Sequence, residues 1–266
     1  MPVRQFHLLT VTGLLVTSLL AVPLPGHAEQ CSAKSSGQRV ALLELYTSEG
    51  CNSCPPADKF LSSLPGQGLT LRQVLPLSLH VDYWNNLGWK DPYSRAQFSE
   101  RQRVAATRDH GSFVYTPQFL LNGIDFRGSY LGDGLAEKVR RINSGKALAE
   151  INLTMKRQPK VLEIAGNAWV PTNREREPAK AYLLLYENNL SNSVNAGENK
   201  GATLHHDFVV RELIGPVALN PDGKADLVHR FTLNANYKPA DLGVAAFVQD
   251  SASGDVLQAL ALPVCR

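Results

Sequence analysis

One short stretch constrains the fold more than any other: TSEGCNSCPPAD at residues 47–58, where two residues separate a pair of cysteines and two prolines follow at once. An apolar, β-rich run at residues 40–46, VALLELY, leads into it. The stretch PPADKFLSSLP then places apolar side chains at the helical spacing i, i+3, i+4 and i+7, and prolines are tolerated in a first helical turn. Cys51 and Cys54 are therefore predicted to lie where a strand passes into the N-terminus of a helix.

A cysteine pair in this position can act as a reversible redox switch. Free N–H groups and partial positive charge at a helix N-terminus favour the thiolate over the thiol. We expect Cys51, at the junction, to be the more exposed and attacking sulfur, and Cys54, one turn inside the helix, to be the resolving one. Glu49 opposes ionisation of Cys51 if the two side chains are close. The alternative is a permanent disulfide between Cys51 and Cys54 without a catalytic role.

A metal site is not predicted from these cysteines. Zinc takes four ligands, and no second Cys-x-x-Cys or closely spaced His pair supplies them. Copper would favour Met or His nearby, yet the only methionine after the first 28 residues is Met155. His205 and His206 are adjacent, and neighbours on a strand point to opposite faces, so a structural role is expected for both. We predict no metal and no bound cofactor.

The first 28 residues are predicted to be a secretory signal peptide. Arg4 precedes an apolar run from Leu8 to Val22, two prolines follow, and small residues end the segment at Ala28, where we expect cleavage. The run is shorter than the roughly 20 apolar residues of a comfortable membrane span. We expect a periplasmic or secreted protein with no membrane span after cleavage; the alternative is an uncleaved N-terminal anchor.

Removal of 28 residues from 266 leaves 238, and the loss of Arg4 lowers the formal charge from +3 to +2. A nearly neutral surface gives no electrostatic reason to expect nucleic acid or acidic lipid as a partner. All four cysteines remain and can meet oxidising conditions. Cys31 and Cys265 would tie the two termini together, which the loop-entropy model values at about 5 kcal/mol. Two free terminal thiols are the alternative.

The rest of the chain divides into two patterns. After the first helix come an apolar strand at residues 74–81, a helix in YSRAQFSERQRVAATR, a hairpin turn at Asn122-Gly123, and a helix at residues 133–143. Residues 146–149 are predicted to form a linker. Beyond them, seven apolar-rich segments joined by Pro, Gly, Asn and Asp turns indicate an antiparallel β-sandwich.

The order strand, helix, strand, helix, hairpin, helix, with Cys-x-x-Cys at the first helix, resembles the thioredoxin fold. The stretches ELYTSEGCNSCPPAD, HVDYW, YTPQFLLNG and TLHHDFVVREL are similar to a family of secreted, thioredoxin-like bacterial proteins catalogued as a domain of unknown function. This likeness spans nearly the whole mature chain. It implies an α/β thioredoxin-like N-terminal domain over residues 38–145, followed by an antiparallel β-sandwich C-terminal domain over residues 149–264.

The resemblance also implies roles for three residues. In the thioredoxin fold a cis-proline before a strand packs beside the cysteine pair, which predicts a cis bond between Thr116 and Pro117; an ordinary trans proline at a strand start is the alternative. A buried acid relays a proton to the resolving cysteine, and Glu44 is the candidate here. Glu44 stands one residue farther from the first cysteine than in that fold, and a structural glutamate is the alternative.

The loop after the second strand supplies candidate substrate-binding residues. Asp82, Trp84 and Trp89 follow the C-terminal end of that strand, and in open α/β sheets this end borders the binding site. These side chains are therefore predicted to line a substrate groove; packing of a long loop is the alternative. His80, at the end of the strand, is expected in the core.

Taken together, these features predict an exported thiol–disulfide oxidoreductase. The Cys51/Cys54 pair would exchange disulfides with partner proteins or small thiols, and the β-sandwich would present or recognise the partner. The alternative is a non-catalytic binding or scaffolding module whose Cys51–Cys54 disulfide is structural.

Overall fold

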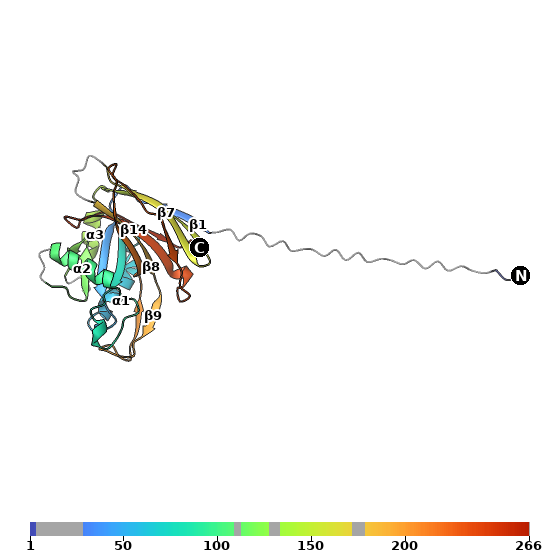
Figure 1. Cartoon of the computed structure of the whole chain (residues 1–266), viewed down its shortest axis with the longest axis horizontal. Coiled ribbons are helices and arrows are strands. Elements are labelled where there is room, and N and C mark those ends of the chain that lie inside the picture. The colour runs from blue at the N-terminus through green and yellow to red at the C-terminus, as the bar shows by residue number, and fades with distance from the viewer. Residues whose placement is uncertain (4–28, 109–112, 128–133, 172–178, 266) are drawn as a thin grey trace.

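The computed structural model describes residues 1–3, 29–108, 113–127, 134–171 and 179–265 (Figure 1). The predicted signal peptide lies almost wholly outside these residues. Within them, the helices are too short or too polar to span a membrane. The α-helices are α1 (Pro55–Ser63), α2 (Ala96–Arg108) and α3 (Leu135–Asn143). Single 3₁₀ turns occupy Leu64–Gln67, Asn85–Leu87 and Pro239–Asp241.

The largest sheet has eight strands and draws on both halves of the chain. From one edge to the other they are β15 (Val256–Pro263), β14 (Leu242–Asp250), β8 (Ala179–Glu187), β11 (Val209–Ala218), β3 (Val74–His80), β2 (Ala41–Thr47), β4 (Gln118–Leu121) and β5 (Ile124–Asp125). The pairs β11–β3 and β3–β2 are parallel, and the other neighbours are antiparallel. The sheet is therefore mixed.

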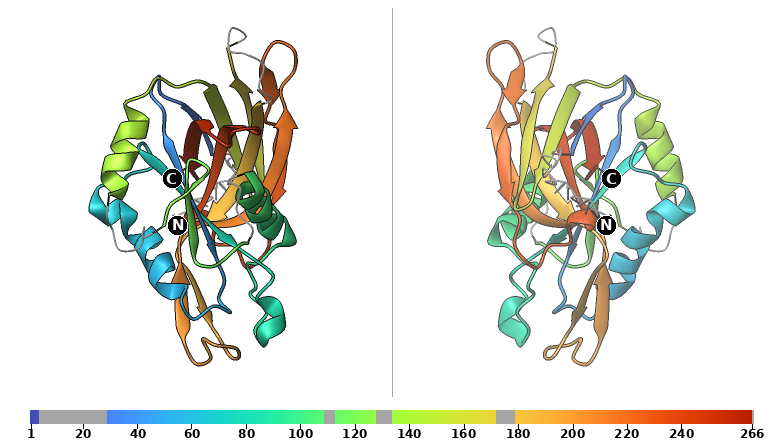
Figure 2. Two further views of the ribbon diagram at one scale, coloured as in Figure 1. Left: turned by 90° about the vertical axis from the view of Figure 1, so that its left-hand side faces the viewer. Right: turned by 90° about the vertical axis from the view of Figure 1, so that its right-hand side faces the viewer.

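A second sheet has five strands, all paired antiparallel. Its order is β1 (Gln30–Lys34), β6 (Glu150–Gln158), β7 (Val161–Trp169) and β12 (Lys224–Asp226), with β13 (His229–Thr232) also on β7. A separate two-stranded hairpin pairs β9 (Leu190–Ser193) with β10 (Thr203–His206). We call residues 190–206 the covering hairpin. It packs against α1, and Figure 2 shows it extending beyond the main sheets near that helix.

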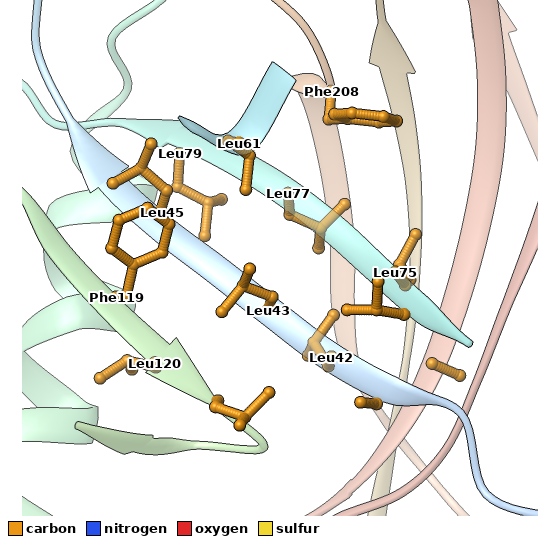
Figure 3. Close-up of a cluster of buried hydrophobic side chains, with 14 of the residues drawn as sticks. Leu42, Leu43, Leu45, Leu61, Leu75, Leu77, Leu79, Phe119, Leu120 and Phe208 are labelled. Carbon is orange, nitrogen blue, oxygen red and sulfur yellow. The ribbon is translucent and has the colours of Figure 1, made fainter. Parts of the chain in front are cut away.

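Two apolar cores hold these layers together. One lies between the two sheets, where alternate residues of β6 and β7 meet alternate residues of β8 and β14, as the period of two in a strand requires. The other surrounds β2 and β3, whose residues are buried on both faces (Figure 3). Its labelled members are Leu42, Leu43, Leu45, Leu61, Leu75, Leu77, Leu79, Phe119, Leu120 and Phe208.

The helices cover opposite faces of β2. Thr47 contacts Asp58 of α1, whereas Glu44 contacts Arg101 of α2. Residues an odd number apart on a strand point to opposite faces, so α1 and α2 lie on different sides of the sheet, as Figure 2 also shows. The end of β2 is thus the point where the cysteine stretch leaves the core on the α1 side.

The predicted fold class, an α/β thioredoxin-like domain followed by a separate β-sandwich, is wrong. Strand β11, from the second half, continues the sheet of the first half by pairing in parallel with β3, where Val209 lies opposite Ser78. Strand β1, from the start, belongs instead to the five-stranded sheet. Apolar runs specify strands but not their neighbours, which explains the error. The limits predicted for two domains, 38–145 and 149–264, stay a prediction, although strands from both ranges share one sheet.

The disulfide predicted between the ends of the chain is present. Cys31 on β1 and Cys265 after β15 are joined, with their Cα atoms 5.8 Å apart. Both residues are half-buried and pack against the apolar core between the sheets. The bond therefore fastens the edge strand β1 of the smaller sheet to the edge strand β15 of the larger one.

Candidate functional site

The cysteine stretch lies where the sequence predicted it, between β2 and α1. Backbone turns close it: the Cys51 N–H donates to the Ser48 carbonyl at 3.1 Å, and the Cys54 N–H donates to the Cys51 carbonyl at 3.2 Å. Cys54 is the N-cap of α1 and does not lie one turn inside the helix as expected, because the helix begins only at the prolines that follow it. Cys51 and Cys54 are joined by a disulfide. The stretch therefore holds the two sulfurs together at the start of the helix.

Both cysteines are buried, with an exposed fraction of 0%. The expectation that Cys51 is the exposed sulfur is therefore wrong for this state. The reason is the covering hairpin, which lies over the cysteine stretch. Its Asn199 side chain donates to the carbonyls of Glu49 and Cys51, both at 2.9 Å, and Glu198 accepts the N–H of Asn52 at 3.0 Å.

The tip of the hairpin also rests on the loop that follows β3. Gly197 has a φ of +72°, and a Cβ built there would stand 3.0 Å from the Cβ of Trp89. A larger residue would be strained at this φ and would press the tip away from the loop. The close packing of the hairpin tip against the Trp89 loop therefore depends on glycine at position 197.

Glu49 joins the hairpin to the site through its carboxylate. It is fully buried and accepts hydrogen bonds from Trp89 Nε1 at 2.9 Å and Asn192 Nδ2 at 2.8 Å. His206 Nε2, at the end of β10, lies 3.2 Å from the other carboxylate oxygen. A buried carboxylate is stabilised by such donors. Glu49 is therefore the anchor of the hairpin, a role that the sequence did not reveal.

His206 bridges Glu49 and Asp58. Its Nδ1 lies 3.6 Å from Asp58 Oδ1, an ion-pair distance that is too long for a hydrogen bond. Burial by itself lowers the pKa of His206, but the nearby carboxylates of Asp58 and Glu49 favour its charged form more strongly and raise the pKa to about 10. Thr47 Oγ1 donates to the other oxygen of Asp58 at 3.0 Å, which fixes that carboxyl group.

A second carboxylate–histidine pair lies beside the first. His80, fully buried at the end of β3, has its Nδ1 2.7 Å from Asp91 Oδ2. Burial raises the pKa of Asp91, but the charge and hydrogen bond of His80 lower it below its ordinary value. The rings of His80 and His206 meet edge to face with centroids 4.9 Å apart. His80 is thus buried as expected, but it is part of a polar cluster.

A further polar cluster was not predicted from the sequence, and the prediction of no metal stays a prediction. Asp58 Oδ1, His80 Nε2 and His206 Nδ1 are buried and have no hydrogen-bond partner, and the three atoms lie within 4.8 Å of one another. They come from α1, β3 and β10, which the chain brings together only through its tertiary fold. His205, by contrast, is exposed, as expected for the neighbour of a buried strand residue.

The predicted threonine–proline turn lies beside the same region. The Thr116–Pro117 bond is cis, as predicted. Trp84 Nε1 donates to Thr116 Oγ1 at 2.8 Å, and a Cβ built on Gly50 would stand 3.2 Å from the Cβ of Trp84. Trp84 therefore packs between the cysteine stretch and the turn. Its predicted role in substrate binding stays a prediction.

The other two predicted binding residues, Trp89 and Asp82, have partners in different parts of the fold. Trp89 is directed at Glu49, as described above. Asp82 instead pairs with Ser99 of α2 through both its backbone N–H and its carboxylate. Asp82 thus fastens α2 to the end of β3, and the roles predicted for Asp82 and Trp89 in substrate binding stay predictions.

Glu44 lies away from the cysteines. It is buried on the face of β2 opposite Thr47, where Arg101 Nε is 2.6 Å from its carboxylate and Tyr46 donates to the same oxygen. Both charged residues line a largely apolar pocket of about 300 Å³ beside α2. This placement does not support the predicted proton relay to Cys54. Buried acids on the cysteine side include Glu49, Asp58 and Asp91.

This chain matches one family model and is similar to two solved structures. A family model described as "Protein of unknown function (DUF1223)" matches residues 42–249. An X-ray structure of an Agrobacterium tumefaciens protein has 26% sequence identity and a TM-score of 0.55, covering 86% of this chain and 96% of that one. HBP35 of Porphyromonas gingivalis shares the fold, with 19% identity and a TM-score of 0.64 over 87% of this chain and 79% of that one. No curated protein matches.

Proposed function

The chain belongs to the DUF1223 family, whose members are described as proteins of unknown function, and on that premise we propose that it exchanges disulfides through Cys51 and Cys54. The observation that carries the proposal is the closed disulfide at the start of α1, set among buried carboxylates and imidazoles. The two disulfides of the structure are consistent with an extracellular location, and export by the predicted signal peptide is part of the proposal.

The reaction proceeds by two sulfur displacements. In the reduced protein, the Cys51 thiolate attacks one sulfur of a partner disulfide; a mixed disulfide forms and the other partner sulfur leaves as a thiolate. The Cys54 thiolate then attacks the Cys51 sulfur, the 51–54 bond forms, and the second partner sulfur leaves. The partner gains two electrons and the protein loses two. The reverse sequence oxidises a partner dithiol.

The local charges act in opposite directions on the Cys51 thiolate. The N-terminus of α1 favours it, but Pro55 and Pro56 remove two of the N–H groups that would face it. The carboxylate of Glu49, two residues away, disfavours it, and His206 offsets that charge by pairing with Glu49. We therefore expect a thiol whose reactivity depends on whether the covering hairpin is in place.

Turnover requires the hairpin to open, because both sulfurs are buried when it is closed. In the described residues, β9 and β10 pair only with each other. Polar contacts hold the hairpin to the cysteine stretch, chiefly those of Glu49, Asn199 and Glu198. Water can replace such hydrogen bonds, which contribute about 0.5–1.5 kcal/mol net each, or about 1.5–3 kcal/mol where the acceptor is a carboxylate, so opening need not disturb either core.

The burial of both sulfurs favours a second candidate function. In it, the 51–54 bond is a permanent part of a binding or scaffolding protein, and the hairpin stays closed over it. This candidate predicts a disulfide that resists reduction as long as the protein is folded.

The two candidates are separated by a trapping experiment with glutathione disulfide. In reduced Cys54→Ser, we expect Cys51 to form a stable mixed disulfide, seen as one added glutathione by intact mass. Cys51→Ser is the matched control, because Cys54 is equally buried, and it should gain none. Absence of an adduct in both variants would support the scaffolding candidate. An adduct in Cys51→Ser alone would overturn the assignment of the attacking sulfur.

A further inference from the structure

We propose that Asp58, His80 and His206 bind one divalent transition-metal ion of the zinc type beside the cysteine stretch. This site is separate from the proposed disulfide exchange and does not depend on it. The three residues come from α1, β3 and β10. These residues are 5%, 0% and 2% exposed, respectively.

The first argument is the three unpartnered atoms. Asp58 Oδ1, His80 Nε2 and His206 Nδ1 have no hydrogen-bond partner, although each is buried from water. A buried polar atom without a hydrogen-bond partner costs about 1–3 kcal/mol, so three of them close together need an explanation. Because the atoms lie within 4.8 Å of one another, one ion can satisfy all three.

The second argument is the set of outer partners. The second polar atom of each ligand is already held: His80 Nδ1 by Asp91 at 2.7 Å, His206 Nε2 by Glu49 at 3.2 Å, and Asp58 Oδ2 by Thr47 at 3.0 Å. A carboxylate that accepts the N–H of an imidazole leaves the lone pair on the opposite nitrogen. This carboxylate–histidine arrangement orients metal ligands and increases their basicity.

The third argument is the chemistry of the ligand set. Two imidazole nitrogens and one carboxylate oxygen suit zinc and related first-row ions, whereas calcium and magnesium take oxygen ligands. A tetrahedral zinc shell with bonds of about 2.05 Å sets its ligand atoms about 3.3 Å apart. The atoms of the site therefore need to close by up to about 1.5 Å. With three protein ligands, the fourth position is left for water or another ligand.

Charge also favours a cation here. Glu49, Asp58 and Asp91 are three buried carboxylates within one cluster. An ion bound to neutral His80 and His206 offsets two of these negative charges. The competing arrangement is metal-free: His206 stays protonated between Glu49 and Asp58 as an ion pair. The experiment must distinguish these two states.

An ion at this site would also connect three parts of the fold. His206 is the last residue of β10, so the ion would fasten the covering hairpin to the end of β3 and to α1. Raised thermal stability on metal addition is therefore a second readout, independent of any activity.

The test is a calorimetric titration of the mature chain with Zn²⁺, with both disulfides intact so that cysteine thiols cannot bind. We expect one Zn²⁺ per chain for the natural sequence and for His205→Ala, which removes an exposed histidine on the same strand. His206→Ala should bind at least 100-fold more weakly. Asp91→Asn, which keeps all three ligands, should lose about 10–100-fold.

Co²⁺ provides a structural check on the same proteins. A site with four or five ligands gives strong visible absorption, which should appear in His205→Ala and be lost in His206→Ala. Circular dichroism establishes that each variant is folded. Equal Zn²⁺ affinity in the two histidine variants, or no binding by the folded natural chain, would overturn the proposal and leave His206 as a structural ion pair.

Discussion

The two disulfides of this protein lie in opposite surroundings. Cys31–Cys265 joins residues 234 apart and packs against apolar side chains between the two sheets. Cys51–Cys54 joins residues 3 apart and lies with Glu49 and Asp58 under the covering hairpin, whose His206 pairs with both carboxylates. The apolar surroundings stabilise the fold by burial. Buried carboxylates cost free energy unless they are paired, so fold stability alone does not explain the second region.

Removing each disulfide in turn tests most directly whether the two bonds differ in their contribution to stability. Loop entropy predicts that Cys31→Ala with Cys265→Ala costs about 5 kcal/mol in the free energy of unfolding, whereas Cys51→Ala with Cys54→Ala costs about 2 kcal/mol. Denaturant unfolding measures both. Equal losses, or a larger loss for the 51–54 pair, would mean that this pair is the main structural bond and would remove the distinction.

The second prediction is that a change on the face of β2 away from the cysteines alters stability but not the reduction of the 51–54 bond. Glu44→Gln removes the partner of Arg101, which is only 12% exposed, and should destabilise the protein by about 3 kcal/mol. Because Glu44 faces away from the cysteines, the rate at which dithiothreitol reduces the 51–54 bond should not change under folding conditions. A slower rate in folded Glu44→Gln would instead support the proton relay predicted from the sequence.

The third prediction concerns the covering hairpin. Asn199→Ala removes the hydrogen bonds to the carbonyls of Glu49 and Cys51. If their loss destabilises the closed hairpin by about 1.4 kcal/mol, the population of the open hairpin rises about tenfold. Reduction of the 51–54 bond by dithiothreitol should therefore be about tenfold faster.

Asn152→Ala is the matched control for Asn199→Ala, because it removes one exposed side-chain hydrogen bond in the five-stranded sheet, to Asn167. It should leave the reduction rate unchanged. The same acceleration in both variants would show that global destabilisation, rather than hairpin opening, exposes the cysteines.

Local structure was largely predictable because its signals lie within short segments. The apolar run before Cys51 and the prolines after Cys54 indicated the β2–α1 junction. Asn122-Gly123 indicated the turn between β4 and β5, where both residues have positive φ, as such a turn requires. His205 and His206 were predicted to point to opposite faces of a strand, and one is exposed whereas the other is buried.

The assembly was not predictable in the same way. Nothing in the sequence of β11 indicates that it pairs in parallel with β3, and this pairing is what joins the two halves in one sheet. The polar cluster depends on that arrangement, since β10 leads directly into β11 and carries His206 to His80. Residues 126 positions apart in the sequence have no spacing that would mark them as ligands. The burial of Cys51 was missed for the same reason.

The central claim is that Cys51–Cys54 is a reversible bond and Cys31–Cys265 a permanent one. Equilibration of the folded protein in dithiol buffers of graded potential, followed by alkylation and mass mapping, measures both in one sample. The account predicts that 51–54 becomes half-reduced above about −300 mV, the level below which structural disulfides of secreted proteins lie, while 31–265 stays oxidised. Reduction of both bonds together below that level would contradict it.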